Sequence, residues 1–268
     1  MVYRKTLIGL TAFLFLFWFV FPILLPGWAA TMYLFTLPAR HLGIFVHEMG
    51  HGLSTLLTGG RFLWFQMELM SGGVAVTSGG VRGLTLLGGL LGPALFGSLL
   101  LVASTRRRGT GFAMTCLVVF FLAGIYYMLK PVFLPGLANS PNSHWSPGML
   151  VAVVVPGFAL LITLTVRTWR GGLQRLFLQV FGILMCFSAF SDTDYIFRYE
   201  QLPNGLFSDA RVFASLLWGP AESVPYWLFL LVAVAISCLN FFFMILGAWR
   251  ALVLESDPAD VPSRAVVQ

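Results

Sequence analysis

The sequence predicts an all-α polytopic membrane protein with about six to seven transmembrane helices and a small glycine-rich β-hairpin region. Of its 268 residues, 58% are apolar and only 10% are charged, whereas soluble domains carry about 25% charged residues. The mean hydropathy is +0.88, and apolar runs close to the roughly 20 residues that cross a bilayer recur along the chain. These observations exclude an ordinary water-soluble enzyme.

Charge and cysteine content argue against a nucleic-acid-binding protein and against a fold held by disulfides or cysteine metal sites. The net charge of +6 is scattered in loops between apolar runs, so it indicates membrane topology and contact with lipid headgroups, and no nucleic-acid partner is expected. The basic residues divide almost evenly between the two sides of the predicted bundle, which leaves both orientations open. The three cysteines lie far apart inside apolar runs and predict neither a disulfide framework nor a cysteine metal site.

The apolar runs define the predicted helices in order. The first, residues 6–25, follows two basic residues, and its length favours an uncleaved anchor over a signal peptide. The second, residues 42–58, carries a polar cluster. Later runs are expected to span the membrane at residues 84–104, 112–129, 149–166, 173–190 and 226–253.

The polar segments complete the predicted organisation. Residues 191–225 are less apolar, and a short helix is expected at residues 209–218. The tail, residues 255–268, is polar and contains two prolines, which predicts disorder. Residues 1–254 are therefore expected to form a single transmembrane domain.

A glycine-rich segment, residues 59–83, interrupts the series of apolar runs. It holds three Gly-Gly pairs, and between them lie the short segments 61–69 and 74–77. Short runs bounded by glycine pairs are typical of strands and turns. We therefore expect a hairpin inserted directly after the second apolar run.

The second run contains His47-Glu48-Met49-Gly50-His51, an H-E-x-x-H motif. Residues four apart share one face of a helix, so His47 and His51 can bind a single metal ion. Zinc suits two imidazoles, a carboxylate and an open water position. Glu48 lies about 100° round the helix from His47, where it can take a proton from a metal-bound water. Ionisable groups within a membrane span are costly and usually functional.

The two other histidines are expected to have no part in metal binding. His41 is expected to be an interfacial residue, and His144 a solvated loop residue. The third metal ligand must come from another segment. The residues alone leave Glu68, Asp192, Asp194 and Asp209 as candidates, and they leave open whether Asp209 instead caps a helix.

The motif and its surroundings resemble the site-2 protease family of intramembrane zinc metallopeptidases. The likeness is carried by His-Glu-Met-Gly-His-Gly at residues 47–52, by the glycine-rich region at 59–83, and by Gly92-Pro93 in the next run. Family members are similar in this order of elements. The resemblance implies a zinc cofactor, proteolysis of membrane-protein or membrane-proximal peptide substrates, and residence in a cytoplasmic membrane of bacterial type.

The resemblance also bears on the third ligand. In the family an Asn-Pro turn precedes a Leu-Asp-Gly whose aspartate binds zinc; the nearest match here is Pro203-Asn204 followed by Ser208-Asp209-Ala210. This implies that Asp209 is the ligand, with Asp194 and Asp192 as rivals. The chain departs from the pattern at Phe96, where well-known members place an asparagine. The departures indicate a divergent branch.

The sequence therefore predicts an intramembrane zinc metalloendopeptidase with Glu48 as its catalytic residue. An inactive scaffold that keeps the same fold is the alternative. A metal transporter is less well supported, because the runs at 84–104, 112–129, 149–166 and 226–253 contain neither histidine nor acidic residues inside the membrane.

Overall fold

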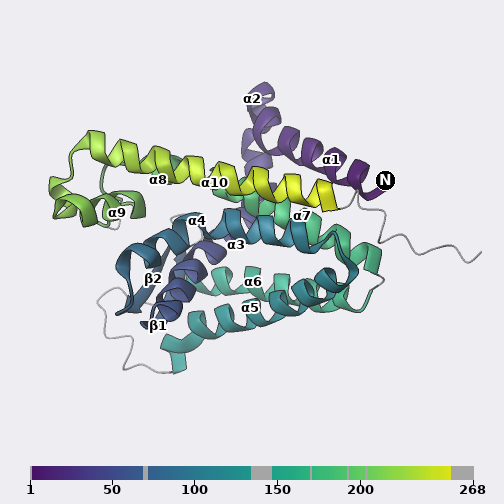
Figure 1. Cartoon of the computed structure of the whole chain (residues 1–268), viewed down its shortest axis with the longest axis horizontal. Coiled ribbons are helices and arrows are strands. Elements are labelled where there is room, and N and C mark those ends of the chain that lie inside the picture. The colour runs from purple at the N-terminus through teal and green to yellow at the C-terminus, as the bar shows by residue number, and fades with distance from the viewer. Residues whose placement is uncertain are drawn as a thin grey trace, which may run out of the picture.

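The computed structural model describes residues 2–68, 72–133, 147–169, 171–191, 193–202 and 205–254. The predicted fold class is confirmed: helices dominate, and the described strands form one two-stranded hairpin (Figure 1). The elements before the hairpin are α1 (Val2–Phe15), the π-helix η1 (Leu16–Val20), α2 (Phe21–Leu24), the short 3-10 helix η2 (Pro26–Trp28) and α3 (Ala29–Leu57). The hairpin consists of β1 (Arg61–Glu68) and β2 (Gly72–Ser78). The later elements are α4 (Arg82–Ala103), α5 (Arg107–Phe133), α6 (Pro147–Arg167), α7 (Gly171–Ser191), α8 (Thr193–Ile196), α9 (Asp209–Trp218), η4 (Ala221–Ser223) and α10 (Tyr226–Leu254).

Among the described residues, five helical stretches are long and apolar enough to cross a membrane. They are Lys5–Leu24, Arg82–Ala103, Arg107–Pro131, Gly171–Ile196 and Tyr226–Leu254. A shorter apolar helix covers Ala152–Arg167. These six stretches coincide with six of the seven predicted spans.

The one predicted span outside these six, residues 42–58, is part of the longer helix α3. This helix begins at Ala29, thirteen residues earlier than expected, and Pro38 lies inside it. It is not among the five long apolar stretches. The physical reason is composition, because Arg40, three histidines and Glu48 interrupt its apolar residues.

The predicted hairpin is confirmed, with β1 and β2 antiparallel and Phe65 opposite Ala75. One face of β1 is apolar. Its Phe62, Phe65 and Met67 are buried and share a core cluster with Phe45 and Met49 of α3. Burial of large apolar side chains stabilises such contacts by about 1.5–3 kcal/mol each. The hairpin is therefore anchored directly on the helix that carries the motif.

Helix α4 lies at the centre of the bundle, packed against α3, α7 and α10 (Figure 1). Its contact with α3 is a backbone contact. A Cβ atom added to Gly50 would lie 2.1 Å from the carbonyl oxygen of Gly88. Small residues of this kind let helices approach closely in a membrane, and here they bring α4 alongside the histidines of α3.

Two further contacts position elements around this core. Helix α9 packs against α4 and the start of α10, and its bounds confirm the predicted helix at 209–218. At the end of α7, the Trp18 indole of η1 donates a hydrogen bond to Ser191 Oγ at 2.9 Å. The predicted disordered tail, residues 255–268, and His144 lie outside the described residues.

Candidate metal centre

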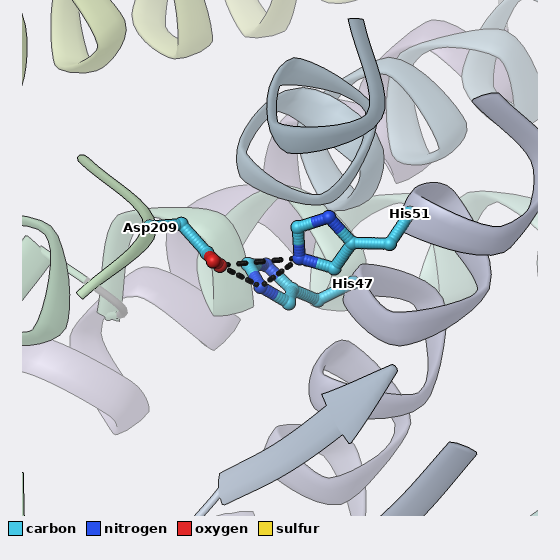
Figure 2. A group of neighbouring side chains, drawn as sticks. All are labelled: His47, His51 and Asp209. Carbon is cyan, nitrogen blue, oxygen red and sulfur yellow. Dashed lines mark hydrogen bonds and ion pairs between the residues drawn. The ribbon is translucent and has the colours of Figure 1, made fainter. Parts of the chain in front are cut away.

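Helix α3 places the two motif histidines on one face. Their Nε2 atoms are 3.1 Å apart, and their rings meet edge to face with centroids 4.7 Å apart. Figure 2 shows both rings directed toward the same point in front of the helix. This is the result of the i, i+4 spacing, which stacks side chains on successive turns.

A carboxylate from a distant part of the chain completes the cluster. Asp209 is the first residue of α9, and its Oδ2 atom lies 2.9 Å from His47 Nε2 and 3.1 Å from His51 Nε2 (Figure 2). Each of the three residues offers one ligand atom to a shared point. Among the described residues, this is the group of histidines, cysteines and acids arranged to hold a metal ion.

The three separations fit a zinc ion. With metal–ligand bonds of about 2.0–2.1 Å, two ligand atoms of a tetrahedral site lie about 3.3 Å apart. The observed distances of 2.9 to 3.1 Å approach that value. Two imidazole nitrogens this close to each other and to a carboxylate need a shared cation or proton between them. Two nitrogens and one oxygen are also the donor set of catalytic zinc sites.

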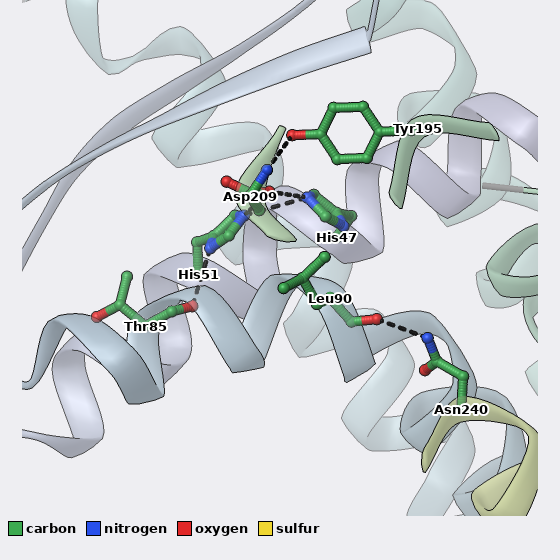
Figure 3. A network of polar contacts seen from close by, with 7 residues as sticks. All are labelled: His47, His51, Thr85, Leu90, Tyr195, Asp209 and Asn240. Carbon is green, nitrogen blue, oxygen red and sulfur yellow. Dashed lines mark hydrogen bonds and ion pairs between the residues drawn. The ribbon is translucent and has the colours of Figure 1, made fainter. Parts of the chain in front are cut away.

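His51 is oriented by the neighbouring helix. Its Nδ1 lies 2.8 Å from the carbonyl oxygen of Thr85 on α4 (Figure 3). Because a carbonyl can only accept, Nδ1 carries the proton and Nε2 is free to bind a metal. A backbone acceptor behind a metal-binding histidine is the usual arrangement. Gly89 makes room for this ring, since an added Cβ would lie 2.2 Å from His51 Nε2.

The backbone of Asp209 is held in place by a hydrogen bond to Tyr195. Its N–H donates to the hydroxyl of Tyr195 at 3.1 Å (Figure 3), and the Tyr195 ring meets His47 edge to face. Helix α9 lies outside the candidate spans. Burial raises the pKa of the Asp209 carboxyl, but the imidazoles of His51 and His47 outweigh burial and hold it well below its usual range. The carboxylate is therefore ionised, as a metal ligand must be.

Glu48 is close to the cluster without belonging to it. The residue is buried, with 4% of its surface exposed, and its carboxyl lies against β2. A Cβ atom added to Gly73 would lie 2.6 Å from Glu48 Oε1. The side chain thus faces the space next to the histidines and the strand, where it can reach a water molecule held near them.

One large cavity contains the whole site. Its volume is about 1340 Å³, and it is lined by the cluster residues, Glu48, Tyr195 and the β2 segment 72–75. Asp194 also lines it but is exposed and is not in the cluster. Asp192 and the side chain of Glu68 lie outside the described part of the chain. The structure therefore brings Asp209, and not Asp194, to the two histidines.

Two sequence interpretations need correction or comment. His41, expected to be interfacial, is buried inside the protein with 1% exposed, so its side chain packs against protein. Phe96, at the position of the family's asparagine, stacks on Phe120 with ring centroids 4.7 Å apart, and this places it in the apolar core. Tyr195 and Thr85 were not predicted. Tyr195 is signalled only by its place in a polar segment, and Thr85 acts through a carbonyl that any residue would supply.

A comparison with known protein families bears on the kind of protein to which this site belongs. Residues 6–138 match the model of the family described as Peptidase M50B-like. This part of the chain is related to the site-2 proteases. The match covers the motif, the hairpin and Gly92-Pro93, and it ends before α9. Peptidases of this family are zinc-dependent membrane metallopeptidases.

The family relationship and the apolar helices together make the chain an integral, multi-pass membrane protein. Neither the curated proteins nor the solved structures that were compared contain a match to it. Since Asp209 lies beyond the matched site-2 protease region, its place beside the histidines depends on the geometry alone.

Proposed function

We propose that the protein is an intramembrane zinc metalloprotease. One observation carries the proposal: His47, His51 and Asp209 converge on a single point in a cavity that also holds Glu48. His47, His51 and Asp209 would hold the ion. The relationship to the site-2 proteases supports the same chemistry from an independent direction.

Each of these residues has a separate role in the proposed hydrolysis. Zinc, when bound, supplies Lewis-acid activation of water at neutral pH. Glu48 accepts the proton of the attacking water and passes it to the leaving amine, and burial beside β2 holds its carboxyl in reach of both. The carbonyl of Thr85 keeps His51 in the tautomer that leaves Nε2 available.

The proposed substrates are transmembrane or membrane-proximal peptides. A helical segment hides its carbonyls in backbone hydrogen bonds, so it must be unwound before hydrolysis. In the described sheet, β2 pairs with β1 along one edge, and its segment 72–75 lines the cavity beside Glu48. Pairing of an extended peptide with the other edge of β2 would present its backbone to the site.

Replacement of Glu48 by Gln tests the proposal. Glu48→Gln keeps the shape of the side chain but removes the base, so peptide hydrolysis by purified protein should fall at least about 100-fold while the zinc content stays near one ion per chain. The exposed Glu200 provides a matched control, and Glu200→Gln should retain full activity. Wild-type rates of cleavage in Glu48→Gln protein would rule out this mechanism.

The alternative is a scaffold that keeps the fold without hydrolysing peptides. The apolar Phe96 in place of the family's asparagine favours it. A wild-type protein that binds one zinc ion yet cleaves no transmembrane peptide, in detergent or in vesicles, would establish this alternative. A transporter would instead move zinc across vesicle membranes.

A further inference from the structure

A buried arginine next to the site is not accounted for by metal binding. Arg211 lies in the first turn of α9, two residues after Asp209, and only 6% of it is exposed. Among the described residues, no carboxylate lies within ion-pair distance of Arg211, and the nearby Asp209 carboxylate contacts the two histidines. The guanidinium of Arg211 is therefore buried without a countercharge, an arrangement that is costly unless its donors are satisfied.

Backbone carbonyls accept from three of the five N–H donors of this guanidinium. Arg211 donates to the carbonyl oxygen of Ala221 at 2.8 Å and to that of Glu222 at 3.2 Å. A third hydrogen bond runs to the carbonyl oxygen of Tyr199. The acceptors lie on both sides of α9 in the sequence. One side chain thus joins the segment that enters α9 to the segment that leaves it.

Two aromatic rings enclose the same group. The guanidinium carbon of Arg211 lies 4.0 Å from the ring centroid of Tyr199 and 4.1 Å from that of Phe207. The Tyr199 hydroxyl in turn donates to the carbonyl oxygen of Val224 at 2.6 Å. A planar guanidinium can stack on rings and donate to several carbonyls at once, whereas a lysine ammonium cannot do both in this way.

The start of α9 depends on this arrangement. Ser208 Oγ donates to the carbonyl of Arg198 at 2.9 Å, and the Asp209 N–H donates to Tyr195. These bonds fix the residues at which α9 begins, and Arg211 joins the same turn to Tyr199, Phe207 and the backbone of residues 221–222. The N-cap residue, Ser208, makes no side-chain capping bond to the helix, and the Asp209 carboxylate contacts His47 and His51, so the position of the carboxylate follows from where the backbone is held.

We propose that Arg211 is a positioning residue for Asp209: it fixes the first turn of α9 so that the Asp209 carboxylate meets the His47–His51 pair. The inference rests on the proposed metal site. Arg211 acts through Asp209, and it touches neither the metal position nor the substrate.

A cobalt titration tests this role. The full-length protein in detergent is stripped of metal and titrated with Co²⁺, whose visible absorption reports the ligand geometry. Arg211→Met should weaken Co²⁺ binding about 10- to 100-fold, as loss of residues that orient ligands usually does, and should change the spectrum. Arg211→Lys should recover little of the loss. The exposed Arg167 at the end of α6 is the matched control, and Arg167→Met should bind as the wild type does.

A double-mutant cycle separates positioning from general stability. In an Asp209→Ala background, Arg211→Met should cause no further loss of Co²⁺ affinity. Equal losses in both backgrounds, or wild-type binding by Arg211→Met, would refute the inference. If Arg211→Met does not fold, Phe207→Leu removes one stacking face and should weaken binding by a few fold; wild-type binding by that variant would refute it too. A wild-type protein that binds no Co²⁺ would instead refute the proposed metal site itself.

Discussion

The two sides of the candidate metal centre, here called its walls, are built in different ways. On one wall, His47 and His51 come from adjacent turns of α3, and α4 supports them through the Thr85 carbonyl and Gly89. On the other wall, Asp209 comes from a short helix more than 150 residues later in the chain, held by Tyr195, Ser208 and Arg211. The first wall is fixed by helical periodicity and the second by polar contacts between residues 10 to 14 positions apart in the sequence. Substitutions should therefore affect the two walls differently.

Removal of both histidines should have the largest effect. His47→Ala/His51→Ala takes away two of three ligands, so the zinc content should fall from one ion per chain to none, and peptide cleavage should be abolished. Metal analysis of the purified protein measures this. The apolar contacts of Phe45 and Met49 remain, so the helical content should persist. One bound zinc ion per chain in this variant would place the metal elsewhere.

The far wall is tested next by Asp209→Asn. The amide keeps the size of the side chain but loses the negative charge, so zinc affinity should fall by at least about 100-fold, the upper end of the loss seen for outer residues. Asp194→Asn is the matched control, because Asp194 lines the same cavity but lies outside the cluster. If Asp194→Asn weakens zinc binding and Asp209→Asn does not, the assignment of the third ligand is wrong.

The support from α4 should show the smallest effect. Gly89→Ala adds a methyl group that would lie 2.2 Å from His51 Nε2, so the ring must shift and zinc affinity should fall about tenfold. Gly83 lies in the same helix, and its nearest neighbour would be 3.5 Å from an added Cβ. Gly83→Ala should leave zinc binding unchanged and stabilise the helix by about 0.5–1 kcal/mol. Isothermal titration of both variants would show whether the near wall depends on α4; equal affinities would show that it does not.

The contrast between the walls also explains what the sequence could predict. The motif on α3 could be predicted from the sequence, with its two candidate ligands and its candidate base, because all three depend on the spacing within one helix. The apolar runs, the hairpin and α9 were located by composition and glycine pairs. The choice among the acidic residues stayed open, because it depends on how segments 193–202 and 205–223 fold onto the core. The role of Arg211 could not be predicted, since its partners are backbone carbonyls that carry no sequence signal.

The close contact between α3 and α4 limits how far the motif itself could vary. In H-E-x-x-H the two middle positions are written as free, yet here Met49 is buried in the apolar core with 1% exposed, and Gly50 leaves no room for a Cβ against Gly88. Packing therefore constrains the two middle positions in this chain, in addition to the chemistry proposed for the other three. A library that varies only positions 49 and 50 should therefore yield few folded proteins. In this chain the two middle positions of the motif are not free to vary.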